Sequence, residues 1–160
     1  MIVTLKALKK ILKRLREQNK RIVFTNGCFD IIHAGHVRVL KKSKKKGDVL
    51  IVGLNSDKSV RKIKGKKRPI MNERDRALIL DSIKYVDYVV LFDEETPYNL
   101  IKEIEPDVLV KGADYKRDEV VGADIVIKKG GEVFLVPLLK GKSTTDVIEK
   151  ILKKYGKDRF

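Results

Sequence analysis

Short apolar segments alternate with amphipathic segments along almost the whole chain, and this alternation limits the folds that the chain can adopt. The run at 49–54 is hydrophobic at every position apart from one glycine, which is typical of a strand covered on both faces. Comparable apolar stretches lie at 22–25, 88–92, 108–110 and 132–136. Strands at these five places, separated by helices, predict an α/β fold with a doubly wound, mainly parallel five-stranded sheet.

Capping residues indicate where the helices begin and end. Thr4 precedes a helix with leucines at helical spacing, and a second helix is predicted from about His36 to Lys46. Gly47 follows that helix at a position suited to left-handed backbone. Further helices are predicted after Asn72, at Thr96-Pro97, and after Ser143-Thr144-Thr145-Asp146, which resembles a capping box.

Composition narrows the class of protein. At 160 residues the chain has room for one domain of ordinary size. No apolar run approaches the length that crosses a bilayer, and the lysine-rich N-terminus does not resemble a secretory signal. The single cysteine, Cys28, cannot form an intramolecular disulfide. We therefore expect a cytoplasmic protein without a membrane-spanning segment.

The chain is strongly basic, with a formal net charge of +15 from 37 Lys and Arg against 22 Asp and Glu. Such a charge favours phosphate-bearing partners, which can be nucleic acids or small molecules. A basic nucleic-acid-binding protein is therefore an alternative from a different functional class. The basic residues are spread over every segment, however, and only five Phe and five Tyr are available to stack on bases. Nucleic acid is for this reason the less favoured partner.

Polar residues follow several of the predicted strands. Parallel α/β sheets bind ligands at the carboxyl ends of their strands, so these loops hold the candidate site residues. The loops comprise 25–30 with the histidines that follow, 55–57, 93–94, 111–114 and 138–145. Three of the five are rich in Gly, Ser, Thr, Asn or Lys, the residue types that hold phosphate and ribose.

The two histidines of the chain, His33 and His36, lie three positions apart where the first strand turns into a helix. At this spacing both rings face the same side of a helical turn, and Gly35 leaves space for a ligand to approach. The free N–H groups at the helix start add an attraction for polyphosphate. Imidazole N–H donors held there can stabilise the charge that develops during nucleotidyl transfer.

Two other interpretations of the histidines stay open. They can be incidental surface residues, or they can join Cys28 in a zinc site. Zinc would need further ligands, and the chain has no other Cys or His. We therefore expect no metal ion bound directly by protein side chains.

The segment 25–36 (TNGCFDIIHAGH) resembles the signature of the cytidylyltransferase-like nucleotidyltransferases, and 143–145 (STT) resembles their second signature. The resemblance extends over roughly residues 21–153. It implies a Rossmann-like nucleotidyltransferase fold, with an N-terminal amphipathic helix over 1–20 and the nucleotidyltransferase domain over 21–160. Within the family, the runs 53–57, Lys64-Gly65 with Arg68-Pro69, and 110–115 most resemble the adenylyltransferase domain of bacterial heptose biosynthesis.

The resemblance implies roles for individual residues. His33, His36 and Lys64 are expected to be catalytic. Contacts to the nucleotide are expected from Thr25, Asn26, Cys28, Phe29, Asp30, Gly35, Arg76, Lys111, Gly112, Asp114, Ser143, Thr144 and Thr145, and contacts to the second substrate from Asn55, Asp57 and Tyr115. Simpler interpretations exist for some of them: Lys64 lies in a basic run typical of a solvated loop, Ser143 can be only a helix cap, and Arg76 can form a surface ion pair with Asp75 or Asp81.

One stretch departs from several relatives. Glycerol-3-phosphate cytidylyltransferases and others carry an Arg-Thr pair shortly before the glycine of the second signature, whereas this chain has Leu138-Leu139-Lys140-Gly141-Lys142. The loss of a phosphate-binding arginine weakens the cytidylyl interpretation and agrees with the heptose branch. Lys140 or Lys142 can compensate for it.

The resemblance implies a magnesium-dependent adenylyltransferase that joins ATP and D-glycero-β-D-manno-heptose 1-phosphate to give ADP-heptose and pyrophosphate. We expect direct in-line attack on the α-phosphorus, because no nucleophile with an adjacent base is visible. Glycerol-3-phosphate cytidylyltransferase and FAD synthetase activities are alternatives within the family. By analogy with relatives we expect a homodimer, for which the apolar stripe of the first helix offers a surface. A separate sugar kinase is also expected, because only about twenty residues precede the first strand.

Overall fold

The computed structural model of the chain describes residues 1–112, 119–139 and 141–156. The predicted doubly wound sheet is confirmed, and every strand pair in it is parallel. The strands are β1 (Ile22–Gly27), β2 (Val49–Asn55), β3 (Tyr88–Phe92), β4 (Val108–Gly112) and β5 (Glu132–Val136), in the order β3-β2-β1-β4-β5. The strand order reverses between β1 and β4, which makes their carboxyl ends the expected place for a ligand.

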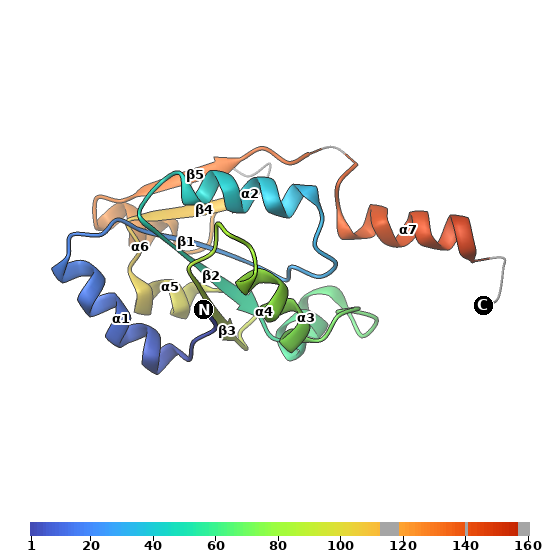
Figure 1. Ribbon diagram of the computed structural model, residues 1–160, viewed down its shortest axis with the longest axis horizontal. Helices are drawn as coiled ribbons and strands as arrows, with labels where there is room; N and C mark the ends of the chain where they lie inside the picture. The colour runs from blue at the N-terminus through green and yellow to red at the C-terminus, as the bar shows by residue number, and fades with distance from the viewer. Residues whose placement is uncertain (113–118, 140, 157–160) are drawn as a thin grey trace.

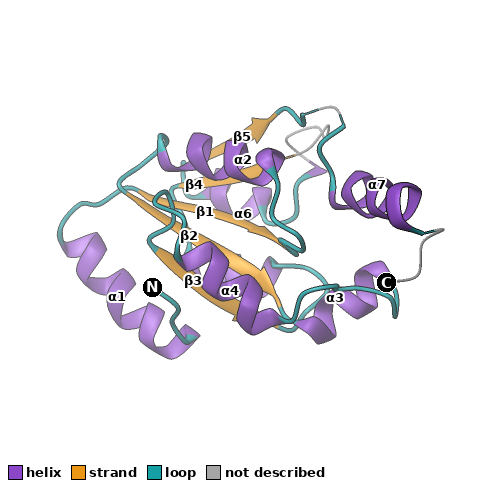
Figure 2. Cartoon of the chain, turned by 45° about the vertical axis from the view of Figure 1, so that its right-hand side comes forward, coloured by secondary structure: helices purple, strands orange, loops and turns teal. Residues whose placement is uncertain are grey.

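Helices cover both faces of this sheet (Figure 1; Figure 2). In chain order they are α1 (Leu5–Glu17), α2 (Ala34–Lys44), α3 (Asp57–Lys64), α4 (Glu73–Asp81), α5 (Tyr98–Ile104), α6 (Ala123–Lys128) and α7 (Thr144–Tyr155). Helices α1, α5 and α6 pack on one face, where they bury Phe24 and Ile51. Helices α2 and α4 pack on the other, over Val23 and Leu50. Neighbouring strand residues thus point to opposite faces and are buried on both, as the continuous apolar runs predicted.

The two terminal helices differ in how they use their apolar residues. Leu8 and Leu12 of α1 are 0% and 1% exposed because they enter the core on the α1/α5/α6 face. The stripe that sequence offered as a dimer surface is therefore buried within the chain, and that prediction is wrong. In contrast, α7 has no buried residue and extends away from the body of the protein (Figure 1).

Several predicted helix ends differ from the structure. Helix α2 begins two residues earlier than predicted, because His33 itself caps it. Gly47 is not in the left-handed region; it is needed because a Cβ there would lie 2.6 Å from the carbonyl oxygen of Arg21. Thr96 does not cap α5, which begins after Pro97 without a side-chain cap. Thr4, Asn72 and Ser143 do cap their helices, as predicted.

Two helices were not expected from sequence. Helix α3 is capped by Ser56, whose hydroxyl accepts from the Ser59 N–H, but its basic run is typical of a solvated loop. Helix α6 has 6 residues, too few for its periodicity to be recognised. In the ranges that the structure describes, none of the helices combines the length and the apolar character needed to cross a membrane.

Candidate active site

The turn between β1 and α2 has a backbone conformation that few residues adopt. Phe29 and Ile31 have φ angles of 47° and 52°, in the left-handed region that is unfavourable for residues with a Cβ. The Phe29 ring is buried, and its centroid lies 5.2 Å from that of the His36 ring. Gly27 makes room for it, since a Cβ there would lie 3.1 Å from Phe29 Cε2. The turn therefore packs Phe29 directly against a signature histidine.

The two histidines form a reciprocal cap at the start of α2. His33 Nδ1 accepts a hydrogen bond from the Gly35 N–H at 3.1 Å, and His36 Nδ1 accepts from the His33 N–H at 3.4 Å. The rings are stacked, with centroids 3.8 Å apart and planes 27° from parallel. Because each Nδ1 accepts, each neutral ring carries its proton on Nε2. The backbone thus fixes two N–H donors beside one helix N-terminus.

Both rings are held in the neutral form. Burial lowers the pKa of His36 to about 4; the nearby His33 lowers it further, and the charge of Asp30 opposes the shift. Burial also lowers the pKa of His33, with Asp146 opposing and Lys142 reinforcing the change. At neutral pH the rings therefore act as hydrogen-bond donors without a positive charge.

Asp30 ties the signature turn to two other segments. Its side chain is fully buried, and its carboxylate accepts from Arg68 Nε at 2.6 Å and from the N–H groups of Ile70 at 2.9 Å and Met71 at 3.0 Å. Burial raises the pKa of Asp30, but these three hydrogen bonds outweigh it and lower the pKa below its ordinary value. Its carbonyl oxygen accepts from the Thr144 hydroxyl at 2.6 Å.

The second signature begins α7 beside the first. Ser143 and Asp146 form a capping box, in which the Asp146 N–H donates to Ser143 Oγ at 3.0 Å and the Ser143 N–H donates to Asp146 Oδ2 at 2.8 Å. A Cβ at Gly35 would lie 2.9 Å from the His33 ring and 3.0 Å from the Lys142 carbonyl oxygen. Gly35 thus allows close packing of the two signatures, rather than only the approach of a ligand. The N-termini of α2 and α7 meet at one place.

Four cationic side chains act electrostatically on the thiol of Cys28. Burial raises the pKa of this thiol, and Lys64, Arg76, Arg68 and Lys111 are near enough to oppose the shift. Lys111 Nζ also donates to Asn26 Oδ1 at 3.1 Å, across the β1–β4 pair where the strand order reverses. Burial lowers the pKa of Lys111, which indicates a cation that would gain from an anionic ligand. The carboxyl ends of β1, β2 and β4 therefore share a positive field.

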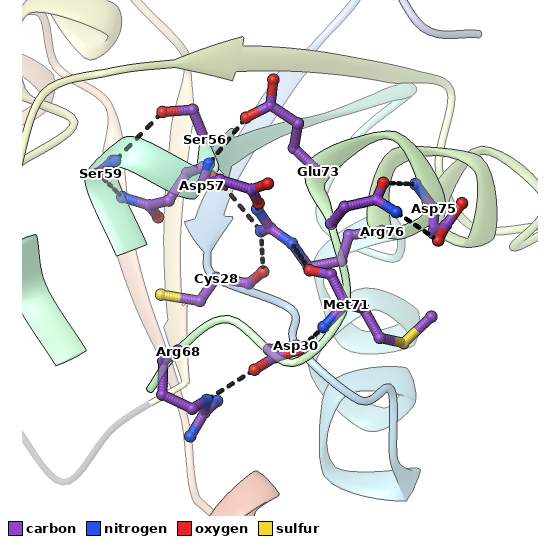
Figure 3. Close-up of polar contacts among 12 residues, drawn as sticks. Cys28, Asp30, Ser56, Asp57, Ser59, Arg68, Met71, Glu73, Asp75 and Arg76 are labelled. Carbon is purple, nitrogen blue, oxygen red and sulfur yellow. Dashed lines mark hydrogen bonds and ion pairs between the residues drawn. The ribbon is translucent and has the colours of Figure 1, made fainter. Parts of the chain in front are cut away.

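Arg76 is completely buried at 0% exposure, in the middle of the contacts drawn in Figure 3. Its Nη1 donates to the carbonyl oxygens of Cys28 at 2.5 Å and Asn55 at 2.8 Å, and its Nε donates to that of Met71 at 3.0 Å. Its Nη2 donates to Asp57 Oδ1 at 2.7 Å. Arg76 therefore joins the loops after β1 and β2 to the segment before α4. The alternative of a surface ion pair with Asp75 or Asp81 is wrong, because the Arg76 side chain is fully buried and its ion pair is with Asp57. The predicted nucleotide contact of Arg76 stays a prediction.

Comparison with known proteins identifies the family. The family model described as "Cytidylyltransferase-like" matches residues 24–150. The chain belongs to the cytidylyltransferase-like family. It is 58% identical over 150 residues to the "Bifunctional protein HldE" of Wolinella succinogenes and 52% identical over 157 residues to that of Geobacter sulfurreducens. These matches cover 94% and 98% of this chain, yet the chain spans only about a third of the length of these curated relatives, 31% and 32%.

Two solved structures are similar to this chain. The lipopolysaccharide core biosynthesis protein from Thermoplasma volcanium is 36% identical with a TM-score of 0.62, covering 76% of this chain and 98% of that one. A pantoate-β-alanine ligase from Francisella tularensis has a TM-score of 0.60 and covers 100% of this chain and 82% of its own. At 18% identity, the second likeness shows the fold alone.

The structure brings together most of the residues that the cytidylyltransferase-like signatures indicated. Histidines, turn residues and the start of α7 lie side by side, and Lys64 and Lys111 contribute to the same positive field. Asp114 and Tyr115 lie outside the described residues. Gly112 is explained by packing, because a Cβ there would lie 2.8 Å from Val39 Cγ2. Thr145 is exposed on the first turn of α7.

Other predicted contacts are directed into the protein. Thr25 is 1% exposed and Asn55 3%, and Asn55 Nδ2 donates to Ser59 Oγ at 2.9 Å. Asp57 binds Arg76, and its N–H donates to Glu73 Oε2 at 2.8 Å. Asp57 also borders an open hollow of about 710 Å³, which is lined by Ser56, Asp57, Lys58, Arg61, Asn72, Glu73, Arg74, Asp75 and Asp93. Of the two second-substrate predictions that fall within the described residues, Asp57 borders this hollow and Asn55 does not line it.

Proposed function

We propose that the chain is an adenylyltransferase that joins ATP and D-glycero-β-D-manno-heptose 1-phosphate to give ADP-heptose and pyrophosphate. The observation that carries the proposal is the meeting of two helix N-termini with two neutral histidine donors, joined through Thr144 Oγ1 and the Asp30 carbonyl oxygen at 2.6 Å. Helix N-termini attract anions, and a polyphosphate is the anion that extends across both. Similarity to the HldE proteins and to the lipopolysaccharide core biosynthesis protein supports the choice of sugar.

The proposed reaction is an in-line displacement at the α-phosphorus. The sugar phosphate oxygen attacks, pyrophosphate leaves, and the Nε2–H groups of His33 and His36 stabilise the charge that develops on the phosphoryl oxygens. Donors that are already fixed by the backbone need little reorganisation at the moment of reaction. Lys64 and Lys111 would add positive charge beside the polyphosphate. Each group serves by position and charge rather than by accepting a proton.

The environment of Cys28 supports direct transfer. Its thiol is a nucleophilic group within the signature turn, but burial raises its pKa, so that the protonated thiol persists at neutral pH. A protonated thiol is a poor nucleophile. We therefore assign no covalent enzyme intermediate to the reaction.

We propose that Mg²⁺ accompanies the nucleotide. Among the described residues, no group of three or more His, Cys, Asp and Glu side chains comes together as a metal site. The Asp30 carboxylate, at the centre of the site, is already occupied by three donors. Mg²⁺ prefers oxygen ligands and is often bound through substrate phosphates, so these residues fit a metal ion held by ATP. Bound there, it would neutralise phosphate charge.

The test of the proposal is to supply heptose 1-phosphate with each of the four nucleoside triphosphates and to follow pyrophosphate release. Glycerol 3-phosphate with CTP and FMN with ATP serve as competing substrate pairs. The proposal predicts the highest kcat/KM for heptose 1-phosphate with ATP. A higher kcat/KM for either competing pair would mean that the chain has another activity of the family.

The partners and location follow from the same proposal. We propose a homodimer, and because the apolar stripe of α1 is buried, we propose that it forms through α7, on which Ile151, Leu152 and Tyr155 are 49%, 63% and 44% exposed. Light scattering during gel filtration measures the oligomeric state.

A sugar kinase activity must supply the heptose 1-phosphate. ATP and phosphorylated sugars are cytoplasmic metabolites, so we place the reaction in the cytoplasm.

A further inference from the structure

Arg68 is a cation of the site whose hydrogen-bonding capacity is mostly unused. Its Nε donates to Asp30 Oδ2 at 2.6 Å, and its side chain is 18% exposed. Within the described residues, neither Nη1 nor Nη2 of Arg68 has a hydrogen-bond partner. A guanidinium has five N–H donors, so four of those of Arg68 have no partner among the described residues.

Arg68 and Arg76 are opposites in this respect. Arg76 is 0% exposed and donates to three carbonyl oxygens and a carboxylate from three segments of the chain. Arg68 makes one such bond and reaches the surface. The guanidinium of Arg76 thus holds loops of the protein together. That of Arg68 is hydrogen-bonded to Asp30 through Nε, and within the described residues its Nη1–Nη2 edge has no protein partner.

The hydrogen bond to Asp30 places Arg68 near the two signatures, where the polyphosphate is proposed to bind. Its partner Asp30 is close enough to influence the pKa of His36, and the Asp30 carbonyl oxygen accepts from Thr144 at the start of α7. Arg68 itself acts on the Cys28 thiol. In Figure 3 its terminal nitrogen atoms point away from the Arg76 contacts. Arg68 therefore contacts the first signature directly and is linked to the second through Asp30, whose fully buried carboxylate sets its orientation.

We propose that Arg68 is a phosphate-binding residue of this site. The Nη1–Nη2 edge presents two parallel N–H donors, the geometry that binds a phosphoryl group through two oxygens. Asp30 holds the guanidinium in place before the ligand arrives, which reduces the entropy lost on binding. The inference rests on the proposed function only in that the phosphoryl group belongs to one of its two substrates, the polyphosphate of the nucleotide or the phosphate of the acceptor.

The experiment compares Arg68→Gln and Arg68→Lys with Lys67→Gln, which removes the same charge from an exposed neighbour in the same loop. Binding of ATP, AMP and adenosine is measured without acceptor, by calorimetry and ligand-observed NMR. The KM for the sugar phosphate is measured separately, and thermal unfolding of each variant is recorded.

For Arg68→Gln we expect about a tenfold to hundredfold loss of affinity for the phosphate ligand, the range for hydrogen bonds to charged groups, and unchanged affinity for adenosine. Arg68→Lys keeps the charge but loses the two-donor edge, so its loss should be smaller. A loss that appears with ATP assigns Arg68 to the nucleotide, and a loss confined to the KM of the acceptor assigns it to the acceptor phosphate.

Three results would overturn the inference: no loss for either substrate, an equal loss for adenosine and ATP, or an equal loss in Lys67→Gln. Equal losses with adenosine would mean that Arg68 only supports the loop. If Arg68→Gln does not fold, Arg68→Lys carries the test, and wild-type affinity for both substrates in that variant refutes the proposal. Because ATP binding is measured without any sugar, a weaker ATP affinity supports Arg68 even where heptose 1-phosphate proves not to be the acceptor.

Discussion

Removing the N–H donor of His36 should lower turnover far more than it weakens ATP binding. With a pKa of about 4, the His36 ring is protonated in only about one molecule in a thousand at pH 7. Because its Nδ1 accepts from the His33 N–H at 3.4 Å, the proton that it can donate is on Nε2. A fixed donor of this kind contributes about 3–4 kcal/mol to transition-state stabilisation, or about 10²–10³ in kcat.

Two substitutions separate the ring atoms. The amide nitrogen of Asn reaches about as far as Nδ1 of the histidine, and that of Gln about as far as Nε2. His36→Asn should lose the full factor in kcat, and His36→Gln should retain part of it. The dissociation constant of ATP should change by less than about tenfold in both, since an interaction made mainly in the transition state contributes little to ground-state binding.

The assay is steady-state pyrophosphate release at saturating substrates, with ATP affinity measured by calorimetry. Wild-type turnover in His36→Asn would refute the role of Nε2. Equal losses of ATP affinity and turnover would show that His36 acts in binding rather than in the transition state. The ionisation of His36 should also leave kcat constant between about pH 6 and pH 8, because its pKa of about 4 lies below this range.

Three further predictions concern the framework of the site. Arg76→Met should lower the free energy of unfolding in urea by about 3–5 kcal/mol, because it leaves buried acceptors unpaired. The control, Met in place of the exposed Arg74, should change it by less than about 0.5 kcal/mol. An equally small loss in both variants would contradict the buried network. Gly35→Ala places a Cβ 2.9 Å from the His33 ring, so it should displace the ring and lower kcat more than about tenfold. Wild-type kinetics in this variant would show that catalysis does not depend on the exact position of the His33 ring. Between pH 6.5 and pH 4 the unfolded chain binds a proton at His36 that the folded chain does not. The free energy of unfolding should therefore decrease as the pH is lowered, by about 2 kcal/mol at pH 5. Unfolding of His36→Gln, measured over the same pH range, should lack this component.

Much of the fold could be predicted because its signals are local. Apolar runs such as 49–54 are continuous in the sequence, and caps such as Thr4, Asn72 and Ser143 act on N–H groups three residues away. The missed helix α6 lacks such a signal, because its 6 residues contain less than two helical turns.

The histidines could be found for a similar reason. His33, Gly35 and His36 contact one another across one turn, so their spacing already contains their geometry. The meeting of this turn with α7 depends on residues more than a hundred positions apart, as in the contact between Asp30 and Thr144. Resemblance to a family could indicate that meeting, but periodicity and spacing could not.

The sequence by itself determined the strands of the sheet and the turn with its two histidines, because each is specified by neighbouring residues. The class of reaction followed from the resemblance of two distant signatures to one family. Only the tertiary structure decided which arginine supports the site from within. Arg76 and Arg68 have the same charge and lie in the same segment of sequence. Arg76 nevertheless donates to acceptors in distant loops, at Cys28, Asn55 and Asp57, whereas one edge of Arg68 has no partner among the described residues. Burial depends on which distant segments pack around a side chain, and that depends on the whole fold.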